Sequence, residues 1–230
     1  MAELYADVRA FATEGPEIAW QHWLETRERL YRTHSQSPVP MADRPTFRIR
    51  RWAYDPALRF ELPLEVDARA PSTAEPPALI ALPNSGAEIL AFRRIGRLTV
   101  PFETGDRFLS LFWMEGYAGG LFLPFRDDTN GTETYGAGRY VLDSAKSADL
   151  GGDPGQGMLV VDFNFAYQPS CAFDPAWACP LAPPENTSTS RSGRANGWCD
   201  DRRAGALRAG ALRARPGRRC RAAVVISRRA

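Results

Sequence analysis

The stretch that sets the class of fold reads Leu58-Arg59-Phe60-Glu61-Leu62-Pro63-Leu64. Its apolar residues alternate with charged residues and a proline, so every second side chain points to the same face of an extended chain. A period of two predicts a strand with one buried face, which is typical of antiparallel sheets. The rest of the chain is therefore interpreted as further strands of a sheet and the elements that cover it.

Other segments with strand character surround this stretch. Residues 47–52 alternate in the same way before it, and apolar segments separated by turn signals follow it. A turn is expected at residues 83–86, and residues 67–77, rich in proline, alanine and serine, are expected to form an exposed loop. The strands expected after the stretch are 79–82, 88–92, 97–102, 108–114, 121–125 and 158–165.

The spacing of the apolar residues changes towards the N-terminus. Apolar residues recur at every third or fourth position between Trp20 and Tyr31. This spacing places them, together with Arg27, on one face of an amphipathic helix. Pro16 suits the first turn of that helix, and a shorter helix over residues 3–13 precedes it.

Together these elements predict an α+β fold that is mainly β. Amphipathic helices within residues 1–36 pack on an antiparallel sheet within residues 46–186. The sheet is expected to close in a barrel-like or sandwich-like way, because a long flat sheet exposes its edges. Residues 1–186 are long enough for a single domain. No run of about 18 apolar residues exists and no secretory signal is recognised, so we expect no membrane span and a cytoplasmic location.

Charge divides the chain at Asn186. The sequence has 29 basic and 27 acidic residues, but residues 187–230 hold 12 arginines against Asp200 and Asp201, a formal charge of +10. Residues 1–186 carry the other 17 basic and 25 acidic residues, a formal charge of −8. The acidic domain argues against a specific nucleic-acid partner. Residues 187–230, with few large apolar residues, are expected to be disordered.

Two polar clusters follow predicted strands, where loops commonly carry function. The first, residues 124–140, combines glycines with charged and phenolic side chains, but its glycine spacing is not that of a dinucleotide-binding loop, so no cofactor is expected. The second, residues 162–173, begins with Asp162 and Asn164, which an extended strand places on one face. We expect the two clusters to meet and form a pocket. The candidate ligand-binding residues are Arg126, Asp127, Thr129, Tyr135, Arg139, Tyr140, Asp162, Asn164 and Cys171.

Two interpretations of these clusters stay open. In the first, the pocket binds or turns over a small polar molecule, and Asp127 or Asp162 acts as the base. Tyr135 or Tyr140 then donates a proton, and an arginine holds an anion. In the second, the same groups form a rigid buried network with an ion pair between Arg139 and Asp127, in a domain with a structural or interaction role.

A metal site is the weakest of the hypotheses. Cys171 and Cys179 lack the short spacing of zinc ligands, so we interpret them as unligated structural thiols, with a disulfide between them as an alternative. A metal would need both cysteines joined by His34 or Asp127. His34 lies at the expected exit of the long helix, where capping of the helix explains it without catalysis.

Three stretches also carry a resemblance to a known family. They are Leu30-Tyr31-Arg32-Thr33-His34-Ser35-Gln36-Ser37-Pro38, the run from Pro124-Phe125-Arg126-Asp127 to Gly138-Arg139-Tyr140, and Asp162-Phe163-Asn164 continued by Cys179-Pro180-Leu181-Ala182-Pro183-Pro184-Glu185-Asn186. They resemble the bacterial and archaeal family catalogued as domain of unknown function 1684. The likeness covers residues 16–186 and implies that the candidate ligand-binding residues and Cys179 match signature positions, but it implies no activity. Asp128 departs from the pattern, in which a small residue is usual.

The resemblance stops after Asn186, where family members continue with a short pair of strands. G- or C-ending codons for residues 187–198, shifted by one frame, encode Leu-Asp-Val-Pro-Val-Arg-Ala-Gly-Glu-Arg-Val, which has the alternation and the glycine of a hairpin. We therefore predict a frameshift at or just before Thr187. On this hypothesis residues 187–230 are not the native sequence of the domain.

Overall fold

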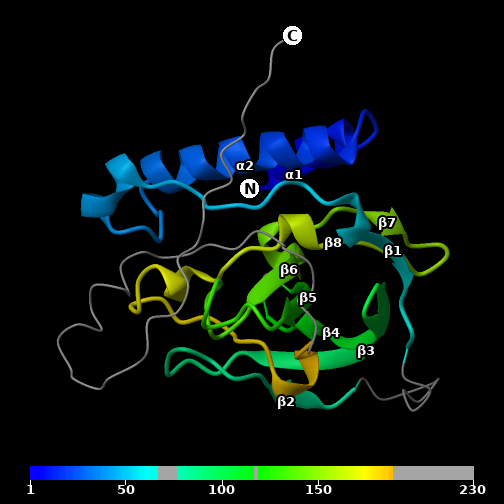
Figure 1. Ribbon diagram of the computed structural model, residues 1–230. Coiled ribbons are helices and arrows are strands. Elements are labelled where there is room, and N and C mark those ends of the chain that lie inside the picture. Colours follow the sequence, from blue (N-terminus) through cyan, green and yellow to red (C-terminus); the bar gives the residue numbers. More distant parts are fainter. Residues whose placement is uncertain (67–76, 117–118, 189–230) are drawn as a thin grey trace, which may run out of the picture. The chain divides into compact units, whose positions relative to one another are not determined.

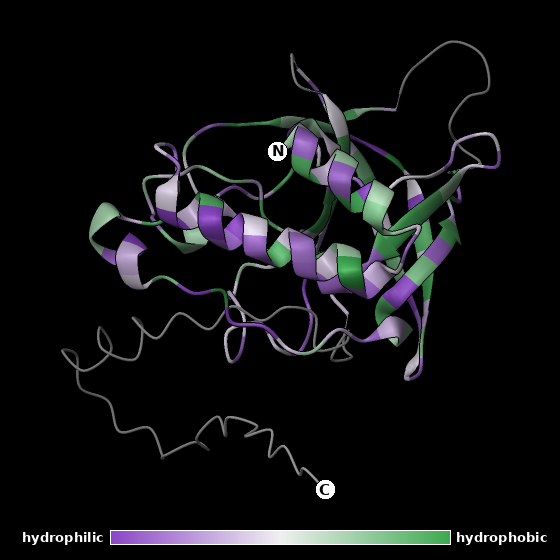
Figure 2. Cartoon of the chain, turned by 90° about the horizontal axis from the view of Figure 1, so that it is seen from above, coloured by the Kyte–Doolittle hydropathy of each residue, from purple (hydrophilic) through white to green (hydrophobic). Residues whose placement is uncertain are grey.

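Two helices begin the chain, as the apolar period predicted. They are α1 Ala2–Phe11 and α2 Pro16–Thr33, and Pro16 lies in the first turn of α2. The indole Nε1 of Trp23 donates a hydrogen bond to the Tyr5 hydroxyl at 2.9 Å, and both side chains are buried, so the helices pack side by side. The face of α2 turned towards the viewer in Figure 2 is mostly hydrophilic, as expected for the outer face of an amphipathic helix.

The computed structural model describes residues 1–66, 77–116 and 119–188 (Figure 1). These residues belong to one unit, Met1–Cys199. The predicted loop at residues 67–77 and the predicted disordered segment at residues 187–230 lie almost wholly outside the described residues.

Strands and short 3-10 helices are the other regular elements of the described chain. The strands are β1 Arg59–Pro63, β2 Leu79–Ala81, β3 Ala91–Phe102, β4 Gly105–Met114, β5 Gly120–Phe125, β6 Arg139–Asp143, β7 Gly152–Asp153 and β8 Met158–Asp162. The 3-10 helices are η1 Met41–Thr46, η2 Pro56–Leu58, η3 Ser144–Lys146, η4 Phe163–Phe165, η5 Ser170–Ala172 and η6 Pro184–Asn186.

All strand pairs are antiparallel and form two sheets that curl into a half-barrel. The five-stranded sheet has the order β2-β3-β4-β5-β6, and the three-stranded sheet has the order β1-β8-β7. A bridge between Glu65 and Arg97 joins the chain after β1 to β3, and a bridge between Tyr140 and Tyr167 joins β6 to the chain after β8. The sheets therefore meet at both seams, which confirms the mainly β, barrel-like prediction (Figure 1).

Close approach of the backbone at one seam requires glycine. A Cβ placed on Gly96 would lie 2.5 Å from the carbonyl oxygen of Glu65, well inside van der Waals contact. The register between β3 and β4 shifts by one residue between Arg94 and Gly96, so the strand bends at the point where the chain after β1 crosses it.

The core has two parts because the sheet buries both of its faces. One part lies between the helices and the sheet and includes Trp23, Phe92, Phe122 and Phe165. The other fills the half-barrel and contains Leu98, Leu111, Leu123, Phe125 and Phe163. Full burial of each of these large side chains contributes roughly 1.5–3 kcal/mol, so the α2 face and the barrel interior supply much of the stability.

Asn186 ties the end of the described chain to the sheet. Its side chain is fully buried, and its Nδ2 donates to the carbonyl oxygens of Ser110 in β4 at 2.9 Å and of Pro124 in β5 at 2.7 Å. Its Oδ1 accepts from the Ser110 N–H at 2.8 Å. One side chain thus satisfies backbone groups of two adjacent strands, which gives the Pro-Pro-Glu-Asn motif a structural role.

Four predicted strands differ from the structure. Residues 47–52 form no strand, and the Ile49 N–H donates to Glu28 of α2 at 3.1 Å instead of to a neighbouring strand. The end of the predicted strand 88–92 and the whole of 97–102 belong to one strand, β3, which begins at Ala91 and continues through the bulge. The last predicted strand ends at Asp162, because the Asp162 carboxylate accepts the Asn164 N–H and begins η4.

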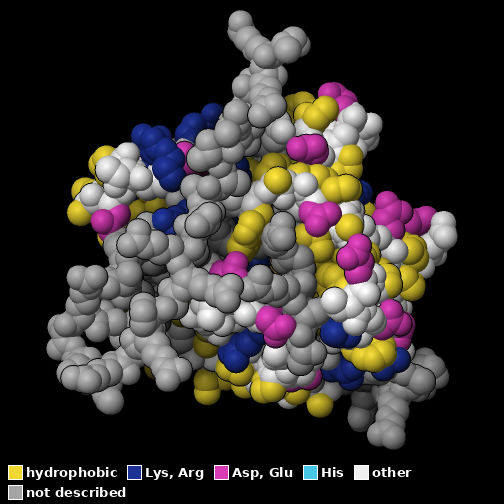
Figure 3. Space-filling view, in the orientation of Figure 1, with side chains coloured by type: hydrophobic (Ala, Val, Ile, Leu, Met, Phe, Trp, Pro, Cys, Tyr) yellow, Lys and Arg dark blue, Asp and Glu magenta, His cyan; other side chains and the backbone are white. Residues whose placement is uncertain are grey.

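The outer surface carries mixed charge. On the face shown in Figure 3, acidic side chains gather on the right, over the region of β1 and β7, in keeping with the acidic excess of residues 1–186. Neither helix in the described part of the chain is long and apolar enough to cross a membrane.

Candidate functional site

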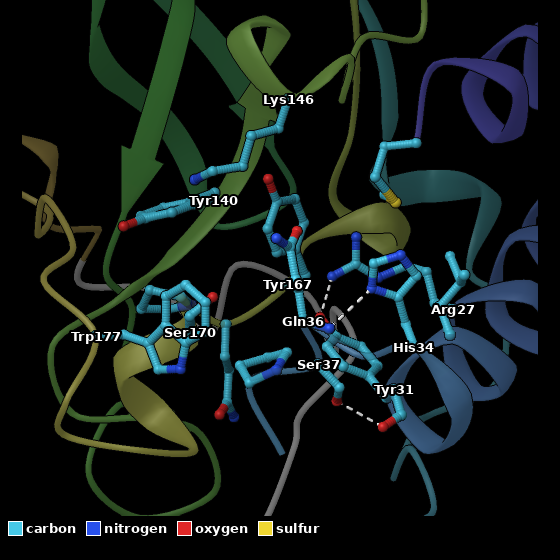
Figure 4. Close-up of a pocket in the computed structure, with 15 residues that line it drawn as sticks. Arg27, Tyr31, His34, Gln36, Ser37, Tyr140, Lys146, Tyr167, Ser170 and Trp177 are labelled. Carbon is cyan, nitrogen blue, oxygen red and sulfur yellow. Dashed lines mark hydrogen bonds between the residues drawn. The ribbon is translucent and has the colours of Figure 1, made fainter. Parts of the chain in front are cut away.

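A cavity of about 360 Å³ opens between the C-terminal half of α2 and the seam at which Tyr140 meets Tyr167. This volume lies within the usual range of small-molecule sites. Figure 4 shows Arg27, Tyr31 and His34 on one side and Tyr140 and Lys146 on the other. The remaining wall comes from Met1, from Leu30, from residues 36–38, from residues 167–170 and from Trp177.

Arg27 is the most unusual of the lining residues, because its charge is buried without a carboxylate partner. Only 5% of the residue is exposed, and its guanidinium carbon lies 4.2 Å from the ring centroid of Tyr167, 5.0 Å from that of Trp23 and 5.2 Å from that of Tyr31. One Nη donates a hydrogen bond to the Tyr31 hydroxyl, and the buried Nε has no partner among the described residues. Burial disfavours the charge, but the surrounding tyrosines Tyr31, Tyr5 and Tyr167 raise the pKa of Arg27 above its ordinary value, so the guanidinium stays protonated.

Lys146 supplies a second cation, but this one is paired. Its Nζ lies 2.9 Å from the Asp143 carboxylate, and the Tyr167 hydroxyl donates to the same oxygen at 3.1 Å. The nearby Asp143 is therefore committed to Lys146 and Tyr167. The lining of the cavity includes neither aspartate nor glutamate, so Arg27 leaves one positive charge uncompensated.

Aromatic rings form the walls beside these cations. Burial, and then the neighbouring Cys179 and Asp143, raise the pKa of Tyr140 well above its ordinary value. Burial and Asp143 do the same for the pKa of Tyr167. Both hydroxyls are therefore neutral at pH 7. The Tyr140 hydroxyl donates to the Pro180 carbonyl, which leaves the Tyr140 ring as its contribution to the wall.

His34 lies at the mouth of the cavity. It is the residue after the last turn of α2, as predicted, and its N–H continues the helical bonding to the Leu30 carbonyl at 2.9 Å. Its side-chain Nδ1 accepts a hydrogen bond from the Gln36 N–H at 3.2 Å, which orients the ring (Figure 4).

The candidate residues of the first cluster form a buried network behind this wall. An Arg139 Nη lies 2.5 Å from Asp127 Oδ2, and both side chains are fully buried. The other oxygen of Asp127 accepts from the Thr129 N–H at 3.0 Å and from the Thr129 hydroxyl at 2.5 Å. The predicted Arg139–Asp127 ion pair is confirmed. Of the candidates in residues 124–140, Tyr140 is the one that lines the cavity.

Arg126 and Tyr135 connect the first cluster to other parts of the chain. The Arg126 N–H donates to the Asn186 carbonyl at 2.9 Å, and its own carbonyl accepts from Ser188 at 2.8 Å. Tyr135 reaches the second cluster, because its hydroxyl lies 3.7 Å from the sulfur of Cys171. The two predicted clusters therefore touch at Tyr135 and Cys171 and, through the Tyr140–Tyr167 bridge, at the cavity wall.

Asp162 and Asn164 form a separate arrangement beneath the N-terminal half of α2. Asn164 Nδ2 donates to Asp162 at 2.8 Å, and the Tyr54 hydroxyl donates to the other Asp162 oxygen at 3.0 Å. Burial raises the pKa of Asp162, although its hydrogen bonds from Asn164 and Tyr54 and the charge of Arg59 oppose this shift. The indole of Trp20 in α2 donates to the Asn164 carbonyl at 3.0 Å, so these polar groups help to seat the helix.

The two described cysteines are free thiols and are buried. Among the described residues, no cluster of three or more histidine, cysteine, aspartate or glutamate side chains is placed to hold a metal ion. His34 lines the cavity, whereas Cys171 and Cys179 lie outside its lining.

The sequence interpretation missed Arg27, Lys146, Tyr167 and Trp177 as site residues. One signal was present for Arg27, because a charged residue occupied the apolar stripe of a predicted helix. Tyr167 lay within the second predicted cluster but was not chosen as a site residue. Lys146 and Trp177 gave no local signal, since they enter the wall through a 3-10 helix and a turn that the tertiary fold brings to the cavity.

Comparison with known proteins identifies a family but no activity. The model of the family described as "Protein of unknown function (DUF1684)" matches residues 47–190. The chain is also similar to an uncharacterized protein of Haloarcula marismortui with a solution NMR structure, at 29% identity and a TM-score of 0.55, over 78% of this chain and 92% of that one. A comparison with curated proteins found no significant match.

Proposed function

This chain belongs to the DUF1684 family of proteins of unknown function, and we propose from its cavity that it binds a small organic anion. The observation that carries the proposal is the buried guanidinium of Arg27, which lines the cavity and has no carboxylate partner among the described residues. A buried charge is stable in a protein when it is paired and hydrogen bonded. A ligand carboxylate supplies both features.

The energetic argument compares the empty and occupied cavity. The three aromatic rings around Arg27 stabilise its charge by roughly 0.5–2 kcal/mol each. An unsatisfied buried N–H costs about 1–3 kcal/mol, and at Arg27 this applies to Nε, since the Tyr31 hydroxyl accepts from an Nη. A bound anion removes this cost and adds charge-assisted hydrogen bonds.

The walls indicate the rest of the ligand. Tyr31, Tyr140, Tyr167 and Trp177 present rings, so the part of the ligand beyond its anionic group is apolar and planar. Because Lys146 is paired with Asp143, Arg27 is the side-chain cation of the lining without a carboxylate partner, and one anionic group on the ligand is enough to pair with it. The proposed site thus includes residues from both predicted clusters. Tyr140 comes from residues 126–140, and residues 167–170 come from the range 162–171.

We propose binding in preference to turnover. Among the four candidate acid–base residues, Asp127, Tyr135, Tyr140 and Asp162, the cavity lining includes Tyr140. The raised pKa of Tyr140 makes it a weak proton donor at pH 7. In this proposal the other three residues act by position, since they fix the loop and the helix that carry the wall.

Benzoate and benzamide provide the first test, because they have nearly the same shape and differ in charge. Calorimetric titration of the full chain is expected to show tighter binding of benzoate. Arg27→Met is expected to weaken benzoate binding about ten- to hundredfold, the equivalent of about 1.5–3 kcal/mol for hydrogen bonds to a charged group. Arg29→Met, on the exposed face of the same helix, is the matched control and should leave binding unchanged.

Three results would overturn this proposal. The first is equal affinity of the parent protein for benzoate and benzamide. The second is an Arg27→Met variant that binds aromatic and aliphatic monocarboxylates as tightly as the parent does. The third is a parent that binds none of them at millimolar concentration.

A structural or interaction module is the second candidate function. The observation that favours it is the complete burial of the Asp127–Arg139 pair, which forms its ion pair and its hydrogen bonds to Thr129 within the domain. Under this alternative, the candidate residues of the first cluster contribute to stability alone. The benzoate titration separates the two candidates, because a purely structural module is expected to bind neither benzoate nor benzamide.

A further inference from the structure

Cys171 and Cys179 lie against each other beside the cavity. The backbone N–H of Cys171 donates to the sulfur of Cys179 at 3.4 Å, and both cysteines are free thiols. They are eight residues apart, and the segment between them carries Trp177, which lines the cavity. About 8% of Cys171 and 6% of Cys179 is exposed, so both thiols are nearly buried and an oxidant that reaches them must be small.

The surroundings of the two thiols differ. A hydrogen bond from the Cys179 thiol lowers the pKa of Cys171 to about 6, against the opposing effect of burial, and bonds from Ser85 and Tyr135 lower it further. The same hydrogen bond and burial raise the pKa of Cys179 above its ordinary value. At neutral pH Cys171 is therefore a thiolate, the nucleophilic form of cysteine, and Cys179 keeps its proton.

We propose that Cys171 and Cys179 form a redox pair, in which a hydroperoxide oxidises Cys171 and Cys179 then closes a disulfide with it. The Cys171 sulfur attacks the terminal peroxide oxygen, the O–O bond breaks, and the leaving oxygen takes up a proton. Cys171 becomes a sulfenic acid. Cys179 gives up its proton as its sulfur attacks Cys171, the S–S bond forms, and water leaves. Overall, two thiols lose two electrons, and one hydroperoxide is reduced to an alcohol and water.

The positions of the neighbours support this order of events. Tyr135 places its hydroxyl 3.7 Å from the Cys171 sulfur, where it stabilises negative charge on that atom. The Cys179 N–H is held by the Ser85 hydroxyl at 2.9 Å, and the Leu181 N–H bonds to the Pro83 carbonyl, so the segment that bears Cys179 is anchored to residues 83–85. A fixed resolving thiol next to a reactive one favours rapid disulfide formation over further oxidation.

The first experiment uses the full chain with Cys199→Ser and Cys220→Ser, which removes the two cysteines outside the described residues. The reduced protein is treated with hydrogen peroxide, alkylated and mapped by mass spectrometry. We expect a cross-linked peptide containing Cys171 and Cys179, which dithiothreitol reverses. Complete alkylation of both residues after peroxide treatment would refute the proposal, and this measurement requires no change to either cysteine.

The second experiment assigns the roles. In the same background, Cys171→Ser is expected to slow the consumption of peroxide by about tenfold or more, since the thiolate is removed. Cys179→Ser should still react and should accumulate a sulfenic acid that dimedone traps at Cys171. The rate of the parent should rise with pH around the lowered pKa of about 6. Sulfenic acid found at Cys179 instead, or equal rates for the two variants, would contradict the assignment. Both readouts follow sulfur chemistry and are independent of benzoate binding.

Discussion

Replacing Asp127 with asparagine is expected to lower the stability of the domain severely. Both side chains of the Asp127–Arg139 pair are fully buried, and their closest nitrogen and oxygen atoms are 2.5 Å apart. Asparagine keeps the shape and can still accept from Thr129, so the substitution removes chiefly the negative charge. Removing one partner of a buried pair costs about 3–5 kcal/mol, because the remaining charge is uncompensated.

The measurement is the free energy of unfolding from urea denaturation, supported by thermal unfolding. For a domain of this size, 1 kcal/mol corresponds to roughly 2–4 °C in Tm, so a fall of roughly 6–20 °C is expected. Asp128→Asn is the matched control, because the adjacent Asp128 is exposed. Its effect should stay within about 0.5 kcal/mol, as for most surface substitutions.

A loss below about 1 kcal/mol for Asp127→Asn, or a loss equal to that of Asp128→Asn, would refute this reasoning. If such a variant kept its stability but lost affinity for benzoate, Asp127 would have a direct role in ligand binding. Combining Asp127→Leu with Arg139→Met should cost less than the sum of the two single changes, since neither charge is then left alone.

Three further predictions concern other sites. Burial raises the pKa of Asp162, so its contribution to stability is complete below the ordinary aspartate pKa of about 4 and is lost as pH rises through the raised pKa. Asp162→Asn should remove this part of the pH dependence of stability. Parallel pH profiles of the parent and the variant in urea denaturation would contradict this expectation. Asn186→Ala leaves three backbone groups of β4 and β5 without their hydrogen-bond partner, and we expect thermal unfolding to show that the free energy of unfolding falls by about 2–4 kcal/mol. A fall below about 0.5 kcal/mol would show that the side chain is dispensable. The frameshift predicted near Thr187 is checked by the gene sequence, and codons for residues 187–198 that do not encode the hairpin-like peptide one frame over would dismiss it.

The helix α2 and the strand β1 were predictable from the sequence because their apolar residues recur at regular spacing along the whole element. The stripe from Trp20 to Tyr31 identified α2, and the alternation after Leu58 identified β1. Residues 47–52 alternate as well, but their backbone follows α2, since a period of two reports extended chain and not a strand partner. Strand β6, Arg139–Asp143, was not predicted, because its first two residues were assigned to the loop 126–140. The charged residues at its ends, Arg139 and Asp143, pair with Asp127 and Lys146.

The candidate site was predictable only in part, because convergence depends on tertiary structure. The sequence identified Tyr140 and the ion pair of Arg139 with Asp127, which adjoin one another along the chain. It did not indicate that Tyr167 lies opposite Tyr140 across the seam, since that pairing depends on the closure of two sheets. The sequence placed Arg27 on the helix face that packs on the sheet. In the structure Arg27 also lines the cavity, and it is there that we propose its contact with an anion.

The position of Asn186 bears on which shortened forms of the chain fold. Its side chain links the two neighbouring strands β4 and β5. Thr187 then forms a bridge with Arg126, and the Ser188 N–H donates to the Arg126 carbonyl, so residues 186–188 together act as a clasp. A chain cut after Ser188 retains every one of these bonds, whereas a chain cut after Ala182 loses them all. A deletion series across this short interval should therefore show an abrupt step in solubility and protease resistance, and the step should fall at the clasp.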